Sequence, residues 1–314
     1  MNILLTGSNG FIGSNFIDMC TERDSFRFVY RSLSQVDPKL NLLDNIEPYI
    51  LNSGIDSQTD WGCALNNIDT VIHLAGLAHG RSSNPDDYHR VNTEGTLKLA
   101  TKAYEAGVKR FVYVSSIGVL GSSTEGGAFD TCSSPTPLNY YAVSKYNAEL
   151  GLKGISKKTG LEIVIIRPTL VYGLGAPGNF GLLSKFIKIF PILPFGLADN
   201  RRDFIAVQNL VDFLFVCASH PKANGQTFLA SDGRTLSIRE FTNAIAIGLG
   251  KRVVQLPVPL GFMRLLGRVL GKSSIIEQLY GDLQVDSSLQ RELLGWVAPF
   301  SVEQAMTSLS GTKK

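Results

Sequence analysis

The sequence predicts an α/β fold in which a doubly wound parallel sheet carries a smaller, discontinuous C-terminal lobe. The first half of the chain alternates short, almost wholly apolar runs with helical patterns. Such runs are typical of parallel strands that helices cover on both faces. After Pro168 the chain becomes rich in glycine and proline, and its periodic runs shorten. We therefore expect residues 1–168 and about 205–230 to form the sheet domain, and about 169–204 and 231–314 to form the smaller lobe.

The strands are expected where short apolar runs end in polar or turn-forming residues. These runs are Asn2–Thr6, Phe26–Arg31, Thr70–Leu74, Arg110–Ser115, Leu161–Arg167 and Thr227–Ala230. Helical patterns separate the runs, as the crossovers between parallel strands require. Residues 32–54 are too irregular for a third strand to be placed there.

Composition narrows the function classes. The 314 residues are 44% hydrophobic and 18% charged, which excludes a disordered chain, and a net charge of +3 gives little attraction for nucleic acid. The four cysteines are too dispersed for a zinc site or a disulfide framework, so we expect a reducing cytoplasm. The start of the chain lacks a signal-peptide pattern, and no apolar run reaches the roughly 18 residues of a membrane span.

A glycine-rich turn follows the first expected strand and opens a helix. It reads Thr-Gly-Ser-Asn-Gly-Phe-Ile-Gly. Glycine permits a tight turn and a close approach of the backbone to a pyrophosphate, and the helix N-terminus adds N–H groups. At the first strand–helix junction of a parallel sheet, this pattern favours a dinucleotide and a Rossmann-type fold over a plain tight turn. The predicted cofactor contacts in the turn are Gly7, Asn9, Gly10, Phe11, Ile12 and Gly13.

The end of the second strand bears on the choice of cofactor. Enzymes that use NAD place an acid there for the ribose hydroxyls, whereas enzymes that use NADP favour a cation for the 2′-phosphate. Here the strand ends in Arg31-Ser32, and the next acid, Asp37, lies six residues further on. The sequence therefore favours NADP(H) and leaves NAD(H) as the alternative. A merely solvated Arg31 would remove this preference.

Tyr141 and Lys145 are the candidate acid/base pair. They lie four residues apart in Asn-Tyr-Tyr-Ala-Val-Ser-Lys, so on a helix they share one face, whereas Tyr140 diverges from Lys145 by about 140°. An ammonium beside a phenol lowers the phenol pKa from about 10 toward the range of a working acid or base. The alternative interpretation is a chance pair on a surface helix.

A serine pair ends the strand that begins at Arg110. Hydroxyl groups at the carboxyl end of a parallel strand lie where doubly wound sheets bind ligands. Ser116, which is 25 residues before Tyr141, is a candidate to hydrogen-bond a substrate oxygen. Ser115 is the competing choice, and either hydroxyl could instead satisfy local backbone groups.

Together these motifs resemble those of the extended short-chain dehydrogenases/reductases, in the nucleotide-sugar epimerase/dehydratase family. The resemblance covers essentially the whole chain. Besides the glycine turn, its motifs are His-Leu-Ala-Gly at the end of the Thr70–Leu74 strand, Val91–Thr96, Ser115-Ser116, Tyr141-x-x-x-Lys145, Arg167–Gly173 and Arg202–Ile205.

The resemblance implies a role for each matching residue. Ser116, five residues before Gly121, corresponds to the catalytic Ser/Thr, Tyr141 to the acid/base, and Lys145 to the residue that binds the nicotinamide ribose. Asn92 would hold the site helix near the cofactor. Further implied cofactor contacts are Leu74, Ala75, Pro168 and, at the adenine, Asp56. Asn179 and Arg202 would bind the diphosphate of the substrate, although the run Tyr-Gly-Asp-Leu-Gln-Val-Asp lacks the arginine that many members place there.

A closer likeness is to bacterial UDP-sugar 4-epimerases and UDP-N-acetylquinovosamine-forming 4-keto reductases. It rests on Thr59–Trp61, Pro194–Gly196, Asn200–Arg202, Asn209–Asp212, Ser231–Gly233, Leu283–Ser288 and Leu294–Trp296. This likeness implies a cytoplasmic oxidoreductase that acts at C4 of a UDP-sugar in surface polysaccharide biosynthesis, and it leaves a homodimer open.

The net reaction expected first is reduction of a UDP-4-keto-6-deoxy-N-acetylhexosamine, and 4-epimerisation is the alternative. A 4,6-dehydratase is disfavoured because Ile117-Gly118 stands where dehydratases of the family carry Asp-Glu. A non-catalytic cofactor-binding scaffold is disfavoured because Tyr141 and Lys145 are both present.

A basic amphipathic run occupies residues 261–272, where Arg264, Arg268 and Lys272 recur among apolar residues. Such a run can lie on an anionic membrane. The sequence favours a lobe helix with a solvated basic face, so membrane contact is not expected.

Overall fold

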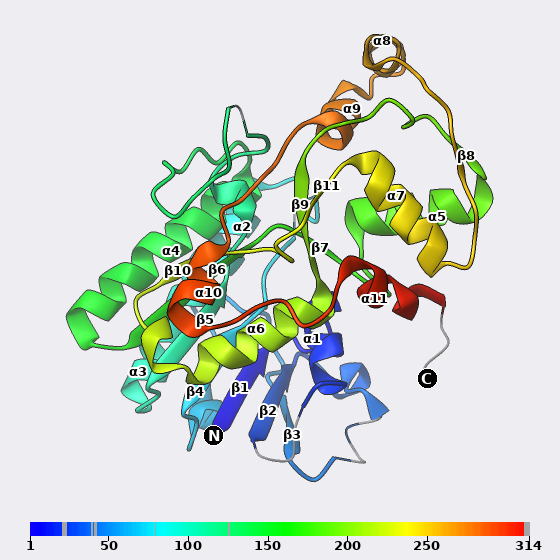
Figure 1. Ribbon diagram of the computed structural model, residues 1–314. Helices are drawn as coiled ribbons and strands as arrows, with labels where there is room; N and C mark the ends of the chain where they lie inside the picture. The colour runs from blue at the N-terminus through cyan, green and yellow to red at the C-terminus, as the bar shows by residue number, and fades with distance from the viewer. Residues whose placement is uncertain (21–23, 39, 41–42, 79, 125, 311–314) are drawn as a thin grey trace.

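The computed structural model describes residues 1–20, 24–38, 40, 43–78, 80–124 and 126–310. Its central sheet has seven parallel strands in the order β10-β6-β5-β4-β1-β2-β3 (Figure 1). The strands are β1 Asn2–Thr6, β2 Ser25–Tyr30, β3 Ile46–Ile50, β4 Thr70–His73, β5 Arg110–Val114, β6 Glu162–Pro168 and β10 Thr227–Ala230. The predicted doubly wound α/β fold is confirmed, and the six expected strands end within a residue of their predicted bounds.

The strand that sequence patterns did not place is β3, at the edge of the sheet. Only Ile46 of its five residues is buried, and the strand contains Glu47 and Pro48. An edge strand needs neither an apolar run nor a complete set of backbone donors, so its pattern is weak.

Helices cover both faces of this sheet. Among the described residues the helices are α1 Phe11–Ile17, α2 Pro85–Tyr88, the π-helix η4 His89–Gly95, α3 Thr96–Glu105, α4 Tyr140–Thr159, α5 Gly178–Ile189, α6 Val207–Ser219, α7 Ile238–Gly248, α8 Leu260–Val269, α9 Ser273–Tyr280, α10 Ser288–Leu294 and α11 Val302–Thr307. Of these, α5, α7, α8, α9 and α11 contribute to a second core instead of covering the sheet. Helices α1 and α6 pack on one face, around Phe16, Phe28 and Phe213, and α3 and α4 pack on the other, around Leu99, Phe111 and Leu152. The chain leaves β1 toward β2 on one side and reaches β4 on the other, so the β1/β4 junction is the switch point at which such sheets bind ligands.

A second hydrophobic core is formed by residues that follow β6 in the sequence, from Tyr172 to Leu309. It includes the stacked rings of Phe204 and Phe241, whose centroids are 3.8 Å apart. Around it lie a three-stranded sheet of β7 Leu170–Tyr172, β9 Arg202–Ala206 and β11 Thr235–Leu236, and a pair of β8 Ile192–Leu193 with β12 Val254–Gln255.

One C-terminal segment returns to the sheet domain. Leu294 and Trp296 belong to the core that α6 covers, and the Trp296 indole donates to Asp212 Oδ2 at 2.7 Å. We propose two lobes centred on these cores, with the segment from Ser288 to Ala298 assigned to the sheet rather than to the smaller lobe. Within the described residues, no helix is both long and apolar enough to cross a membrane.

Candidate active site

The glycine turn between β1 and α1 has no room for side chains at two positions. Gly7 has φ +77°, and a Cβ there would come within 2.8 Å of Ala75 N. A Cβ on Gly13 would lie 2.2 Å from Gly7 O. The N-terminus of α1 has no side-chain cap at Gly10, and Asn9 and Gly10 are exposed. Backbone this close to the strand ends, with N–H groups open at its helix end, fits the pyrophosphate of a dinucleotide.

The other candidate cofactor residues follow the carboxyl ends of neighbouring strands. Arg31 follows β2 and is exposed, Leu74 and Ala75 follow β4 and are half-buried, and Pro168 ends β6. Leu74 N donates to Thr6 O, which ties the end of β4 to β1. These positions surround the switch point between β1 and β4, so they fit a cofactor that lies across it. The contacts of these residues with a cofactor remain predictions.

Asp56 lies in a separate loop beneath the π-helix η4. Its carboxylate accepts a hydrogen bond from Gln58 N at 2.9 Å and thus closes a local turn. The loop packs closely on Gly95, where a Cβ would meet Ile55 Cγ2 at 2.9 Å. The adenine contact of Asp56 remains a prediction.

Helix α4 carries Tyr141 and Lys145 from a capped start. Asn139 is the N-cap, and its side chain accepts from Ala142 N at 2.9 Å. Tyr140 is 62% exposed, whereas Tyr141 is half-buried with its ring edge-on to Tyr88. The cap fixes where the helix begins and therefore which of the two phenols faces the protein.

The expectation that Lys145 lowers the pKa of Tyr141 is wrong for this structure. Burial raises the pKa of Tyr141, and a hydrogen bond with Ser116 offsets part of that rise. The Lys145 ammonium instead donates to Val114 O at 3.0 Å and lies 4.8 Å from the centroid of the Tyr113 ring. Burial, rather than the charge of Lys145, therefore sets the direction of the Tyr141 pKa shift. Tyr141 therefore keeps its proton at neutral pH.

Lys145 is itself strongly affected by its surroundings. Burial lowers its pKa to about 8, and the Glu149 carboxylate opposes that shift. Its Nζ would lie 3.4 Å from a Cβ on Gly76, the glycine of the His-Leu-Ala-Gly run. Lys145 therefore carries its charge at neutral pH but loses it more readily than an exposed lysine.

The two serines after β5 have different partners. Ser115 is buried and donates to Glu149 Oε1 at 2.5 Å. Ser116 accepts from Gly118 N at 3.1 Å, and its hydroxyl hydrogen-bonds with Tyr141. The Ser115 hydroxyl is thus bound to Glu149 in the protein interior, and Ser116 is the serine beside the candidate acid/base.

A buried ion pair that sequence analysis missed lies next to Lys145. Glu149 and Arg167 are 1% and 4% exposed, and Arg167 donates to both carboxylate oxygens, at 3.0 Å from Nε and 2.6 Å from Nη2. The spacing of Tyr141, Lys145 and Glu149 at every fourth residue was the available signal for Glu149. Nothing in the sequence pattern paired it with Arg167 on β6.

Asn92 joins the catalytic helix to the loop after β4. Its side chain accepts from Leu77 N at 2.7 Å and donates to Leu77 O and to Ser144 Oγ, each at 3.0 Å. It lies in the π-helix η4, and neighbouring Thr93 donates to Ser144 O at 2.9 Å. Asn92 is completely buried, so its contribution is to hold α4 against the strand end.

His73 is a second buried residue that sequence analysis missed. Its Nε2 lies 2.9 Å from Thr96 Oγ1, which donates its own proton to Asn92 O at 2.7 Å. Nε2 must therefore donate, and Nδ1 accepts from Thr6 Oγ1 at 2.6 Å. Burial, with a smaller effect of the Lys145 charge, lowers the pKa of His73 to about 3. A neutral His73 thus links β1, just before the glycine turn, to the first residue of α3.

The candidate substrate residues lie in the smaller lobe. Asn179 is exposed near the start of α5 and donates to Gln278 Oε1 at 3.3 Å. Arg202 begins β9 and donates from Nη1 to Gly281 O at 2.7 Å, and burial lowers its pKa. Gly281 lies close to Ser123, in the loop that follows Ser116. Arg202 therefore binds a segment that lies beside this loop, and the diphosphate contacts of Asn179 and Arg202 remain predictions.

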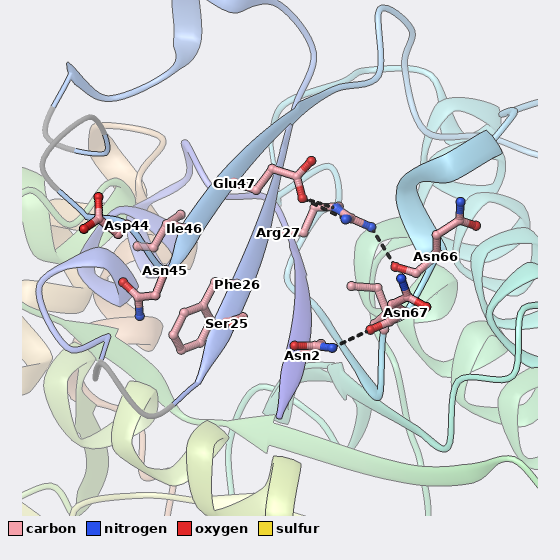
Figure 2. A pocket seen from close by; sticks show the side chains of 11 residues that line it. Asn2, Ser25, Phe26, Arg27, Asp44, Asn45, Ile46, Glu47, Asn66 and Asn67 are labelled. Carbon is pink, nitrogen blue, oxygen red and sulfur yellow. Dashed lines mark hydrogen bonds and ion pairs between the residues drawn. The ribbon is translucent and has the colours of Figure 1, made fainter.

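A cavity of about 240 Å³ lies at the other end of the strands, where β1, β2 and β3 begin (Figure 2). It is lined at the amino ends of β1, β2 and β3 by residues such as Asn2, Arg27 and Glu47. Arg27 donates to Glu47 Oε2 at 2.9 Å and to Ala64 O at 2.9 Å, which closes this edge. Parallel sheets bind ligands at their carboxyl ends, so we assign this cavity no part in the site.

The doubly wound sheet, the glycine turn and the Ser116–Tyr141–Lys145 group define a protein of the short-chain dehydrogenase/reductase class. The chain matches the model of the NAD dependent epimerase/dehydratase family over residues 3–230 and belongs to that family. It is similar to the UDP-glucose 4-epimerase of Vibrio cholerae, with 38% identity over 309 residues, 96% of this chain and 92% of the relative.

Other proteins are also similar to the chain, and the solved structures among them show the same fold. The N-acetyl-alpha-D-glucosaminyl-diphospho-ditrans,octacis-undecaprenol 4-epimerase of Escherichia coli O157:H7 is 25% identical over 97% of this chain and 93% of its own length. The Thermotoga maritima UDP-glucose 4-epimerase with UDP-glucose has a TM-score of 0.76 at 23% identity, covering 99% of this chain and 97% of that one. The Bacillus cereus UDP-glucuronic acid 4-epimerase in complex with NAD has a TM-score of 0.78 at 20% identity, covering 99% and 96%.

Proposed function

We propose that the protein catalyses hydride transfer at C4 of a UDP-linked sugar, and that its favoured net reaction is reduction of a 4-keto sugar. The observation that carries this proposal is the group of Ser116, Tyr141 and Lys145 at the carboxyl end of β5, with the glycine turn at the neighbouring switch point. When bound, the nicotinamide supplies or accepts the hydride. The similarity to the UDP-glucose 4-epimerases of Vibrio cholerae and Thermotoga maritima supports a UDP-linked substrate.

The chain's own residues would handle the proton. In the reductive direction, Ser116 would donate a hydrogen bond to the C4 carbonyl oxygen, and Tyr141 would transfer its proton to that oxygen as C4 gains the hydride. Lys145 would bind the cofactor ribose and hold positive charge near the phenolate that remains. Asn179 and Arg202 would bind the diphosphate, a role that suits a guanidinium.

The protonation state of Tyr141 suits the reductive half-reaction. Its raised pKa keeps the phenol protonated at neutral pH, as a proton donor requires. A 4-epimerase also contains this half-reaction, so the protonation state of Tyr141 does not separate the two candidates. Exposed Arg31 at the end of β2 supports NADP(H) as cofactor, whereas the family description and the relatives with bound NAD support NAD(H).

The second candidate is a UDP-sugar 4-epimerase, and the Vibrio relative at 38% identity favours it. In that reaction Tyr141 would remove the proton from the C4 hydroxyl and later return one to the 4-keto oxygen. The same residues would serve both reactions, so their arrangement does not separate them. The cytoplasmic location and the homodimer remain predictions under either candidate.

Two incubations separate the candidates. Purified protein is mixed with UDP-4-keto-6-deoxy-N-acetylglucosamine and NADPH or NADH, and separately with UDP-glucose or UDP-N-acetylglucosamine. The absorbance of the reduced nicotinamide is followed, and the sugars are identified by NMR. A reductase oxidises one nicotinamide per 4-keto sugar reduced. An epimerase produces the C4 epimer without net consumption of cofactor, and no change in either mixture would reject both.

A further inference from the structure

The smaller lobe contains a helical hairpin of α8 and α9, which lies far from the central sheet (Figure 1). Its apolar residues Phe262, Leu265, Leu266, Val269 and Leu270 are between 42% and 75% exposed. Their spacing of three and four residues places them on one side of α8. Helices of a lobe usually turn such a side toward a core. Here the apolar side of α8 is exposed to solvent instead. The expectation of a lobe helix with a solvated basic face does not account for this exposure.

The protein side of α8 is formed by other residues. Met263 and Gly267 are its buried positions, and a Cβ on Gly267 would lie 2.8 Å from Ile276 Cγ1 of α9. Arg264 completes the hairpin by donating to both Glu277 oxygens, at 2.8 and 3.0 Å. The hairpin is therefore held together without the exposed apolar residues, which are free to contact something else.

Charge narrows the choice of partner. Residues 260–280 contain Arg264, Arg268, Lys272 and a single acid, Glu277, so three positive charges less one negative charge leave +2. Because Arg264 is paired with Glu277, the net positive charge resides on Arg268 and Lys272. A fitting partner must offer both an apolar layer and negative charge. A phospholipid bilayer with anionic head groups offers both.

We propose that the α8–α9 hairpin docks the protein on the surface of an anionic bilayer. The apolar side of α8 enters the boundary between head groups and acyl chains, and Arg268 and Lys272 contact lipid phosphates. A second copy of the chain fits less well. A two-fold contact through this face would bring the basic residues of both copies together, which is unfavourable.

Vesicle sedimentation tests the proposal with the full chain. The probes are vesicles of phosphatidylcholine alone and vesicles that also contain phosphatidylglycerol, at low and high salt. One variant is Leu265→Gln/Val269→Gln, and another is Arg268→Gln/Lys272→Gln, which leaves the Arg264–Glu277 pair intact. The matched control is Ile247→Gln/Val297→Gln, which changes two apolar residues that are 73% and 65% exposed elsewhere.

The wild type should bind the phosphatidylglycerol vesicles more tightly than the others, and high salt should weaken that binding. A basic residue near such a surface contributes about a factor of five, so the Arg268/Lys272 variant should bind about 25-fold more weakly. The Leu265/Val269 variant should lose about tenfold or more, and the control should bind as the wild type does. Turnover of a soluble UDP-sugar should stay within about twofold in all variants, so this test is independent of the proposed reaction.

Three results would overturn the proposal. The first is a wild type that does not bind the anionic vesicles, and the second is equal binding by the wild type and both hairpin variants. The third comes from sedimentation velocity without lipid: a wild-type dimer that the Leu265/Val269 variant abolishes would assign the face to a second copy of the chain.

Discussion

Replacing Glu149 by Gln should destabilise the protein through the cation that it leaves behind. The Glu149 carboxylate accepts from Arg167 Nε and Nη2 and from Ser115, and both ion-pair partners are almost fully buried. Glutamine has nearly the same shape but carries no charge, so Arg167 becomes a buried guanidinium with no counter-ion. Removing one partner of a buried pair costs about 3–5 kcal/mol.

That cost can be converted into a melting shift. Unfolding entropy of about 2.1 cal/mol/K per residue gives about 0.7 kcal/mol/K for 314 residues. We therefore expect Tm to fall by about 4–8 °C in calorimetry. The control is Glu303→Gln, which breaks the Arg234–Glu303 pair, whose side chains are 54% and 58% exposed. Exposed pairs contribute about 0–1 kcal/mol, so this control should shift Tm by less than about 2 °C.

A double variant identifies the cause. Glu149→Gln/Arg167→Met removes the buried cation, so it should recover much of the stability that Glu149→Gln loses. A double variant less stable than Glu149→Gln, or a Glu149→Gln variant no less stable than Glu303→Gln, would refute this reasoning.

The Glu149→Gln change has a second readout, because the Glu149 carboxylate raises the pKa of Lys145. In Glu149→Gln the pKa of Lys145 should fall below about 8, and the alkaline loss of activity should begin at lower pH.

Three further outcomes follow from the site. Tyr141→Phe should reduce kcat by about 10²–10⁴-fold with little change in the cofactor Kd, whereas Tyr140→Phe should have little effect; equal losses would contradict the assignment of the helix face. Arg31→Asp should shift preference from NADP(H) toward NAD(H) in binding titrations, and a wild type that already prefers NAD(H) would show that Arg31 is only solvated. His73 has a folded-state pKa of about 3 against an ordinary value of 6.5, so its stabilising effect is complete above about 6.5 and is lost as pH falls toward 3. Thermal melts should show this acid loss in the wild type, and a His73→Asn variant with an unchanged acid loss would rule out His73 as its source.

The parts of the fold that sequence predicted are those fixed by local pattern. Strands such as Arg110–Val114 are buried along their whole length, so their apolar runs stand out. The glycine turn was recognisable because Gly7 needs a positive φ and Gly13 a close approach. Strand β3 was missed because an edge strand with Glu47 and Pro48 needs no such run. Local pattern therefore predicts interior elements better than edges.

The polar networks of the site depend on residues that meet only after the sheet forms. Arg167 is on β6 and Glu149 is on α4, and their pairing required a register that no local pattern states. Helix spacing correctly predicted that Tyr140 and Tyr141 face different ways, but it could not predict burial. Burial is the larger influence on Tyr141, and it reversed the expected direction of the pKa shift.

Buried polar contacts hold the elements that carry the site in place. Asn92 fixes α4 to the loop after β4, and His73 fixes the start of α3 to the end of β1. Glu149 holds Ser115 inward, which leaves Ser116 to meet Tyr141. The Asn92 and Glu149 contacts constrain the strand ends relative to α4, and the His73 contacts constrain them relative to α3. An acid/base must stay within hydrogen-bond reach of its substrate oxygen, and a shift of about 1 Å can cost about 10²-fold in rate. The networks are therefore expected to act on turnover through position, even though none of their members is a proton donor in the proposed reaction.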